Sequence, residues 1–469
     1  MISLTVEEII KSTEGKLIYG DNNYEIKKIV IDSREADESS LFVAVIGESQ
    51  DGHKYIKSAY ELGCRAFLIS DDSFLTDGLE GSSVIKVDNT EIALGKIAKY
   101  YRGAFDIPVI GVTGSVGKTT TRDMIYSVVS NKFNTLKNEK NLNNQFGVPL
   151  TLFNLNREHE CAVIEMGMCG FGEIEYLVDI VRPKIGVISN IGMSHIELLG
   201  SQEGIFKAKM EIATYFDESS TLVVNGDDKF LSKVYKEYME SDKKGYTVYS
   251  FGKNKNNTVC LLDSKNIGDE KTIFSVKIEG MEGIVELAIP TVGEHNLYNA
   301  MSAIIVGRVM GMEMDEIREG LMNFVPTKDR QDVIKTDKYT IINDVYNASP
   351  DSMIASMKVL NLYDTRKVAI FGDCLEMGSF AEEGHRKVGA QTLDKVDVII
   401  TTGEAARFIG TEAKERGFDL SNVYHFETKE ELINSLDEIL QNNDSILVKA
   451  SRGMKFEDIV KYLEGGCKC

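Results

Sequence analysis

The stretch VIGVTGSVGKTTTRDM, residues 109–124, reads as a strand that runs into a glycine-rich turn and then a helix. A phosphate-binding loop needs glycines that permit the turn, converging backbone N–H groups, a helix N-terminus and a lysine. The common pattern is a glycine, four residues and then Gly-Lys-Ser/Thr. Here Val112 occupies the position of the first glycine, with Gly111 before it and Gly114 after it. The stretch therefore predicts a nucleotide phosphate site built on a variant loop.

The residues of this turn are the first predicted nucleotide-binding residues: Thr113, Gly114, Ser115, Val116, Gly117, Lys118, Thr119 and Thr120. Thr119 stands where a hydroxyl commonly binds Mg²⁺ in such loops, although it could equally cap the first helical turn. After the loop, Met124, Ile125, Val128 and Val129 recur at helical spacing and should face a sheet. The strand, turn and helix together favour nucleotide binding.

The composition excludes several classes of protein. The 469 residues are 43% hydrophobic and 27% charged, without a long apolar run, which argues against a membrane or disordered protein. The net charge of −20 argues against nucleic acid as a partner. The first residues show no secretion leader, so we expect a cytoplasmic protein. Seven cysteines without C-x-x-C spacing indicate reduced thiols, and the Cys-Lys-Cys at 467–469 reads as an exposed tail.

Apolar β-branched runs alternate with amphipathic helical stretches along the whole chain, which predicts an α/β fold. We expect three domains: a small N-terminal α/β domain at 1–103, a central domain with a mainly parallel sheet at 104–325, and a doubly wound, Rossmann-like domain at 326–469. Within the central domain, residues 247–290 are polar and alternating, which favours an antiparallel insert.

Two side chains at strand ends predict a metal site. Glu165 ends the apolar run CAVIE, and His195 follows the strand VISN at the same carboxyl edge of the expected sheet. Either residue alone reads as an ordinary loop residue. Following a phosphate loop, together they favour a magnesium cluster with Thr119.

Several motifs resemble the central ATPase domain of the Mur ligases, which build the peptidoglycan precursor. They are GVTGSVGKTTT at 111–121, NEKNLNNQFGVPLTL at 138–152, NIGMSHIELLGS at 190–201 and GEHNLYNA at 293–300. The loop of that family is commonly Gly-x-Thr-Gly-x-x-Gly-Lys-Thr-Thr. The resemblance therefore explains the early glycine at 111 as a family trait.

In the C-terminal region, INDVYNASPDSM at 342–353 and ILVKASRGMKFEDIV at 446–460 resemble the member of the family that adds the last unit of the peptide. The resemblance implies ATP-dependent phosphorylation of a peptide carboxylate, followed by amine attack on the acyl phosphate. It implies the substrates UDP-N-acetylmuramoyl-tripeptide and D-alanyl-D-alanine, a UDP-precursor-binding N-terminal domain, ATP binding by the central domain, and ligase function in the C-terminal domain. We expect a monomer.

The resemblance also implies roles for individual residues. The catalytic set is Lys118, Glu165, His195 and Lys209, and the ligands of two Mg²⁺ ions are Thr119, Glu165, His195 and Lys209, with Lys209 carbamylated. The nucleotide set adds Asn296 and Asn299 for the adenine, Arg330 for the phosphates and Asp344 for the ribose. The substrate set is Ser33 and Arg34 for UDP, Asn141 and Asn144 for the sugar, and Tyr346, Asn347, Ser451 and Arg452 for the dipeptide.

From the residues alone, other interpretations stay open. Asn296 and Asn299 could cap a helix, Lys209 could be a solvated lysine, and Ser33 with Arg34 could form an Asx-type turn without a ligand. At the level of function, the alternatives are another Mur-type or folylpolyglutamate-type ligase that adds a different amino acid, and a nucleotide-dependent switch. A switch would need the loop but neither the metal cluster nor Arg330.

Overall fold

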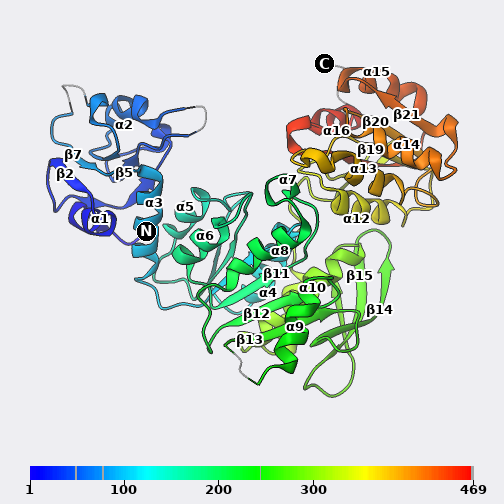
Figure 1. Ribbon diagram of the computed structural model, residues 1–469, viewed down its shortest axis with the longest axis horizontal. Helices are drawn as coiled ribbons and strands as arrows, with labels where there is room; N and C mark the ends of the chain where they lie inside the picture. Colours follow the sequence, from blue (N-terminus) through cyan, green and yellow to red (C-terminus); the bar gives the residue numbers. More distant parts are fainter. Residues whose placement is uncertain (48–49, 76–78, 243–244, 466–469) are drawn as a thin grey trace.

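The computed structural model describes residues 1–47, 50–75, 79–242 and 245–465. The Cys-Lys-Cys tail at 467–469 lies outside these ranges. Three lobes follow one another along the chain, with the central lobe between an N-terminal lobe, coloured blue, and a C-terminal lobe, coloured yellow to red (Figure 1). Among the residues described, no helix has both the length and the apolar character needed to cross a membrane.

The N-terminal lobe contains a five-stranded sheet in the order β2-β7-β6-β5-β4, of which only β2 is antiparallel to its neighbour. Its strands are β2 (Lys16–Tyr19), β4 (Lys28–Val30), β5 (Ser40–Val43), β6 (Ala66–Ile69) and β7 (Ser83–Lys86); β1 (Leu4–Thr5) pairs separately with β3 (Glu25–Ile26). Its helices are α1 (Val6–Thr13), α2 (Ile56–Glu61) and α3 (Thr90–Arg102).

The central lobe is built on a nine-stranded sheet in the order β16-β15-β14-β13-β12-β11-β8-β10-β9. The strands are β8 (Val109–Thr113), β9 (Thr135–Lys137), β10 (Cys161–Glu165), β11 (Ile185–Ile188), β12 (Thr221–Asn225), β13 (Thr247–Gly252), β14 (Val259–Ile267), β15 (Lys271–Ile278) and β16 (Val285–Ile289). The expected antiparallel insert is found in β14 to β16, but β13 pairs in parallel with β12 and so extends the parallel part.

Helices cover the two faces of this sheet. They are α4 (Lys118–Val129), α5 (Gly147–Leu152), α6 (Glu173–Val181), α7 (Ile196–Leu199), α8 (Gln202–Met210), α9 (Leu231–Glu240), α10 (Glu294–Val309) and α11 (Met314–Met322). Helix α4 packs on α10 and α11, and its residues Met124, Ile125, Val128 and Val129 are buried, as their spacing predicts.

The C-terminal lobe has a six-stranded sheet in the order β17-β18-β22-β19-β20-β21, parallel except for β17. Its strands are β17 (Asp332–Lys335), β18 (Tyr339–Asn343), β19 (Lys367–Phe371), β20 (Val398–Thr402), β21 (Val423–Phe426) and β22 (Asp444–Lys449), and its helices are α12 (Pro350–Leu360), α13 (Ala381–Gly389), α14 (Arg407–Glu415), α15 (Lys429–Ile439) and α16 (Glu457–Leu463). The predicted fold class is confirmed. The limits at 103 and 325 stay our proposal for the domain boundaries.

Both outer lobes pack against the central lobe. Helix α3 of the N-terminal lobe packs on α5 and α6, and the buried Tyr101 hydroxyl donates to Leu155 O at 2.6 Å. The C-terminal lobe also makes polar contacts with the central lobe, such as Lys335 Nζ with Asp269 Oδ2 at 3.0 Å. Buried apolar side chains of both outer lobes belong to one core cluster with those of the central lobe, and ion pairs are added at the contact with the C-terminal lobe.

Helices α4 and α11 pack closely at Gly320 of α11, where an added Cβ would lie 2.6 Å from Val128 Cα and 3.0 Å from Ser127 O of α4. We expect Gly320→Ala to lower the free energy of unfolding by about 2 kcal/mol, because these obstructing atoms are backbone and cannot rotate away. That cost exceeds the gain of ~1 kcal/mol in helix propensity. Denaturant unfolding measures the difference. Gly245→Ala, with no atom within 4 Å of the new Cβ, is the control, and equal stability of both variants would contradict the prediction.

Candidate active site

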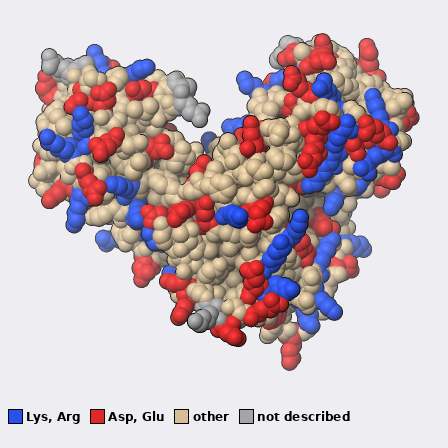
Figure 2. Space-filling view, viewed as in Figure 1, with Lys and Arg blue, Asp and Glu red and all other residues tan. Residues whose placement is uncertain are grey.

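A cleft of about 1360 Å³ lies where the lobes meet. Its walls include the predicted residues Ser115, Val116, Gly117, Lys118, Thr119, Thr120, Asn141, Asn144, Glu165, His195, Asn296, Asn299, Arg330, Asp344, Tyr346, Asn347, Ser451 and Arg452. Glu91 and Ile92 of the N-terminal lobe also line it. Figure 2 shows the surface hollowed between the two outer lobes, with acidic and basic side chains mixed over this face.

The glycines of the loop have different tasks. Gly111 lies inside β8, where a Cβ would come within 2.5 Å of Met166 Cε and 3.3 Å of Pro183 Cβ. Gly117 has a φ of 80° and caps the start of α4, a backbone conformation that favours glycine. The early glycine therefore belongs to the strand, whereas Gly117 belongs to the turn that starts the helix.

The N-terminus of α4 is the part of the loop that is open to an anion. In the described chain, the N–H groups of Lys118, Thr119 and Thr120 have no backbone acceptor, as expected in a first helical turn. By contrast, Ser115 N donates to Asn190 O and Val116 N to Asn190 Oδ1, each at 3.0 Å. A phosphate would therefore be held by the helix end and not by every N–H of the loop.

Lys118 extends along the loop, and its Nζ donates to Gly114 O at 2.9 Å. Burial lowers the pKa of Lys118 from its ordinary value, the Glu165 carboxylate opposes this shift, and the charge of Arg330 adds to it. Nearby, the Ser115 hydroxyl is buried without a hydrogen-bond partner in the described chain. A cation and an unused hydroxyl at a helix N-terminus form a binding site suited to phosphate oxygens.

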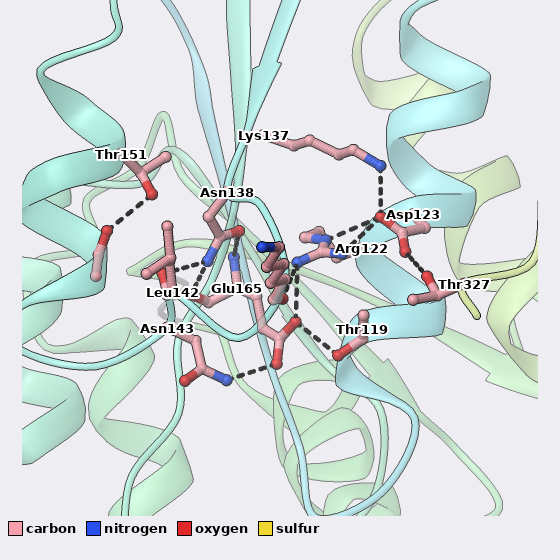
Figure 3. Close-up of polar contacts among 12 residues, drawn as sticks. Thr119, Arg122, Asp123, Lys137, Asn138, Leu142, Asn143, Thr151, Glu165 and Thr327 are labelled. Carbon is pink, nitrogen blue, oxygen red and sulfur yellow. Dashed lines mark hydrogen bonds and ion pairs between the residues drawn. The ribbon is translucent and has the colours of Figure 1, made fainter. Parts of the chain in front are cut away.

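Glu165 is the buried acceptor next to this helix end, with 2% of its surface exposed. Its Oε2 accepts a hydrogen bond from Thr119 Oγ1 at 2.9 Å and an ion pair from Arg122 Nη1 at 3.3 Å, while its Oε1 accepts from Asn143 Nδ2 at 2.7 Å (Figure 3). The side chain of Asn138 makes two hydrogen bonds to the backbone of Glu165. Its Oδ1 accepts from Glu165 N at 2.9 Å, and its Nδ2 donates to Glu165 O at 3.0 Å. The carboxylate is thus held in one orientation.

The donor set at Glu165 fits Mg²⁺. No three His, Cys, Asp or Glu side chains of the described residues are grouped closely enough to hold a metal by themselves. Magnesium, however, is usually bound through one or two protein oxygens, with substrate phosphates and water completing its shell. The Thr119 hydroxyl and the Glu165 carboxylate supply such oxygens beside the phosphate loop. The binding of Mg²⁺ by Thr119 and Glu165 stays a prediction.

His195 and Lys209 lie apart from the Thr119–Glu165 pair, and no hydrogen bond or ion pair of the described chain joins them to it. His195 has a φ of 62°, and its Nδ1 lies 2.7 Å from Glu376 Oε2 of the C-terminal lobe. Lys209, on α8, does not line the cleft and is 1% exposed. Burial and the neighbouring Lys118 charge lower the pKa of Lys209 well below its ordinary value. Lys209 is therefore not the solvated lysine that its sequence context allows.

Asn296 and Asn299 on α10 face the cleft but already bind one another. Thr121 Oγ1 donates to Asn299 Oδ1 at 2.8 Å, Asn299 Nδ2 to Asn296 Oδ1 at 3.2 Å, and Asn296 Nδ2 to Val292 O at 2.8 Å. Neither side chain caps α10, whose N-cap residue is Gly293. Each amide oxygen accepts one hydrogen bond and keeps a second lone pair, while Asn296 Nδ2 already has two acceptors, so a ligand could bind either oxygen or the remaining N–H of Asn299.

The C-terminal lobe presents Arg330 and Asp344 to the same cleft. The Arg330 guanidinium lies 3.9 Å from the centre of the Tyr346 ring, and its Nε is buried without a partner in the described chain. Asp344 Oδ2 accepts from Lys449 Nζ at 2.6 Å and from Ser356 Oγ at 2.5 Å. One oxygen of the predicted ribose-binding acid is therefore taken by Lys449 and Ser356.

The other predicted dipeptide residues surround this pair. Asn347 O accepts from Lys449 Nζ at 3.0 Å, and the Ser451 hydroxyl accepts from Leu375 N at 2.9 Å. The Arg452 guanidinium lies 5.4 Å from the Tyr346 ring centre. Two arginines therefore approach one tyrosine ring at the mouth of the cleft.

Comparisons with known proteins decide the family. Three family models match successive parts of the chain: Mur ligase family, catalytic domain, at residues 25–102; Mur ligase middle domain at 112–307; and Mur ligase, glutamate ligase domain, at 329–452. The UDP-N-acetylmuramoyl-tripeptide–D-alanyl-D-alanine ligase of Bacillus subtilis (strain 168) is 37% identical over 470 residues, covering 99% of both chains. The chain belongs to the Mur ligase family.

Solved structures agree with this assignment along the whole Mur ligase chain. MurF from Acinetobacter baumannii superposes with a TM-score of 0.89 at 29% identity, covering 99% of each chain. MurF from Thermotoga maritima, solved in complex with ADP, gives a TM-score of 0.81 at 26% identity and covers 93% of this chain and 97% of that one. The resemblance seen in the motifs is therefore confirmed.

Ser33 and Arg34 lie away from the cleft of this Mur ligase, in the N-terminal lobe. They belong to a short 3-10 turn, Ser33–Glu35, in which Asp32 Oδ1 accepts from Arg34 N at 3.0 Å. Arg34 Nε also lies 2.9 Å from the same oxygen. The Asx-type turn is therefore present, and the role of these residues in binding UDP stays a prediction.

Sequence reasoning missed several residues that shape the site of this Mur ligase: Asn138, Asn143, Arg122, Glu376 and Lys449. Asn143 lies in the same NLNN stretch as Asn141 and Asn144, yet only Asn143 reaches Glu165. Asn144 instead accepts from Gly147 N at 2.9 Å at the start of α5. The amide-rich composition was the available signal, but it does not say which amide points inward.

The stack of Arg330 on Tyr346 generates a prediction about nucleotide binding. We expect Arg330→Lys to weaken ADP binding about tenfold, because an ammonium keeps the charge but loses the planar stacking and the fork of donors. Isothermal titration calorimetry with ADP and Mg²⁺ measures the change. Tyr346→Phe keeps the ring and should bind ADP within about twofold of the unmodified chain. Unchanged affinity of Arg330→Lys would contradict the role of the stacked guanidinium.

Proposed function

We propose that this chain catalyses the ATP-dependent addition of D-alanyl-D-alanine to UDP-N-acetylmuramoyl-tripeptide. The observation that carries the proposal is one cleft that contains the phosphate loop, the fixed Glu165 carboxylate and a C-terminal-lobe arginine. Relatives and structural neighbours that match almost the whole chain carry the name of this ligase. A simple nucleotide switch would have no need for Arg330 in that cleft.

The chemistry requires charge neutralisation. A peptide carboxylate that attacks the γ-phosphate of ATP meets strong anion repulsion, and the cations Lys118 and Arg330 reduce it while the N-terminus of α4 orients the phosphates. Thr119 and Glu165 would hold a Mg²⁺ ion, which supplies further positive charge at the phosphates. The same positive surroundings stabilise the oxyanion of the tetrahedral species that forms when the amine attacks the acyl phosphate.

We propose that Lys209 acts as a carbamate. A neutral amine adds to CO₂ with loss of a proton, and burial, which lowers the pKa of the Lys209 amine, favours the neutral form. The product is an anion that, with His195, suits a second Mg²⁺. Carbamylation also explains why a lysine is buried here without an acidic partner in the described chain.

The C-terminal lobe completes the site and shields it. His195 with Glu376, and Met193 N with Asp351 Oδ2 at 3.1 Å, bring that lobe against the loop that follows β11. Because these contacts are polar, they can separate and re-form as substrates enter and products leave. Closure excludes water, which would otherwise hydrolyse the acyl phosphate.

We place the UDP moiety at Ser33 and Arg34, the sugar near Asn141 and Asn144, and the dipeptide near Tyr346, Asn347, Ser451 and Arg452. Glu91 and Ile92 of the N-terminal lobe line the cleft that contains the phosphate loop, which supports a long substrate that spans two lobes. We further propose that the enzyme works as a monomer in the cytoplasm.

The decisive experiment measures phosphate release from ATP with each acceptor pair. We expect turnover only when UDP-N-acetylmuramoyl-tripeptide and D-alanyl-D-alanine are both present, because acyl phosphate formation and amine attack use one closed cleft. Equal turnover with a single free amino acid, or with folate and glutamate, would instead establish the alternative ligase. Lys118→Ala is the negative control: we expect its rate to fall at least about a hundredfold, with an unchanged unfolding midpoint.

The carbamate at Lys209 has its own test. We expect Lys209→Ala to lose nearly all activity and to recover part of it when a short carboxylate such as acetate or propionate is added, because the carboxylate replaces the missing anion. Lys207→Ala on the same helix is the control, since Lys207 is solvent-exposed. Full activity of Lys209→Ala without added carboxylate would show that no carbamate is needed.

A further inference from the structure

Four buried or half-buried charged side chains form a connected row that starts at Glu165 and continues through Arg122 and Asp123 to Lys137. Arg122 Nη1 lies 3.3 Å from Glu165 Oε2, and the same guanidinium donates through Nε and Nη2 to Asp123 Oδ1 at 3.0 and 2.8 Å. Lys137 Nζ reaches that Asp123 oxygen at 2.8 Å. Two cations thus balance two carboxylates, which is the condition under which charges are tolerated in an interior.

The orientation of Arg122 is fixed on every side. Its side chain is 3% exposed, and Nη1 also donates to Lys140 O at 3.1 Å in the loop that carries Asn143. Thr119 and Arg122 are one turn apart on α4, so both face the same Glu165 oxygen. The position of Glu165 Oε2 therefore depends on a guanidinium that Asp123 in turn holds in place.

The network continues into the segment between α11 and β17 that joins the central and C-terminal lobes. Thr327 Oγ1 donates to Asp123 Oδ2 at 2.5 Å, as Figure 3 shows. The segment next contains Asp329 and Gln331, with φ of 62° and 56°, a conformation that non-glycine residues rarely adopt. Gln331 Oε1 lies 2.8 Å from His295 Nε2 of the central lobe. Arg330 therefore lies between two residues with positive φ. The segment contacts the central lobe before Arg330, through Thr327, and after it, through Gln331.

Two features distinguish this arrangement from ordinary packing. The Thr327 bond reaches the second oxygen of Asp123, whereas the first is already shared by Arg122 and Lys137. The rare backbone conformations at Asp329 and Gln331 persist only where surrounding contacts hold them. A continuous chain of hydrogen bonds therefore runs from Glu165 through Arg122 and Asp123 to Thr327, and the backbone leads from Thr327 directly to Arg330.

We propose that Arg122, Asp123 and Thr327 are positioning residues, which couple the segment that carries Arg330 to the orientation of the Glu165 carboxylate. When Thr327 is bonded to Asp123, Arg330 faces the phosphates and Glu165 faces the metal at the same time. When the bond breaks, as the C-terminal lobe moves away, Asp123 loses the partner of its Oδ2, so it holds the Arg122 guanidinium less firmly and the alignment of Glu165 weakens. The metal site is therefore complete only when the phosphate-binding arginine is in place.

The inference rests on the proposed nucleotide site, so its test measures binding and not ligase turnover. The quantity is the ratio of the ADP dissociation constant in EDTA to that in Mg²⁺, which reports how well the protein's oxygens support the metal–nucleotide complex. Titration calorimetry gives both constants. A role in stability alone would leave this ratio unchanged and lower only the unfolding midpoint.

We expect Thr327→Val to lower the ratio about threefold, the size typical of a change within a coupled network. Arg122→Lys should lower it about tenfold, since it removes a direct partner of the metal-binding carboxylate. Thr327→Ser keeps the hydroxyl and should restore the ratio of the unmodified chain. Thr411→Val is the matched control, because among the described residues the Thr411 hydroxyl donates only to Arg407 O, within α14.

The double variant Arg122→Lys/Thr327→Val gives the sharpest outcome. If the two residues act through one chain of contacts, adding Thr327→Val to Arg122→Lys produces no further loss. Independent, multiplying losses would overturn the proposal, as would an unchanged ratio in Thr327→Val, which is half-buried and should fold. Failure of the unmodified chain to bind ADP would overturn both the proposed function and this coupling, whereas normal ADP binding without ligase activity would overturn the function alone.

Discussion

The hydrogen bond from Thr119 to Glu165 joins the first turn of α4 to the carboxyl end of β10, and the site is arranged around it. It exists because β8 and β10 are adjacent parallel strands, with Glu165 in register with Val112. Parallel neighbours end at the same edge, so the helix that follows β8 begins beside the residue that ends β10. A phosphate bound at the N-terminus of α4 and a metal ion bound by the Glu165 carboxylate would therefore lie next to each other.

Burial of charge is the second constraint on this region. Four charged side chains lie close together beside the phosphate loop: Arg122, Asp123, Lys137 and Glu165. Their burial is possible because each has an opposite charge within hydrogen-bond distance. Burial by itself would raise the pKa of Asp123, but Arg122 and the hydrogen bonds from Lys137 and Thr327 lower it overall. Lys209 departs from this rule, since it is buried beside another cation. An uncompensated buried amine is costly, which is the physical reason to propose a carbamate there.

Much of the fold could be predicted because its signals are local. Short β-branched runs alternating with amphipathic helices predict parallel sheets, and the buried face of α4 follows from the spacing of Met124, Ile125, Val128 and Val129. The assignment of β13 to the antiparallel insert was wrong because an alternating pattern does not say in which direction the neighbouring strands run, and β13 pairs in parallel with both β12 and β14. The early Gly111 looked like part of a phosphate motif, yet it lies within strand β8, before the turn.

The sequence by itself determined the α/β class, the phosphate loop with its lysine, the carboxylate at the end of the strand that follows and the resemblance to the Mur ligases. The loop and the strand-end carboxylate are each encoded within a few consecutive residues, and the fold class and the resemblance are sums of such short local signals along the chain. Only the tertiary structure decided that Asn143 and not Asn144 contacts Glu165, that Lys449 holds Asp344, and that Thr327 reaches Asp123. These pairs are brought together by the crossing of helices, strands and loops far apart in the chain, and side-chain direction at such crossings has no local signature.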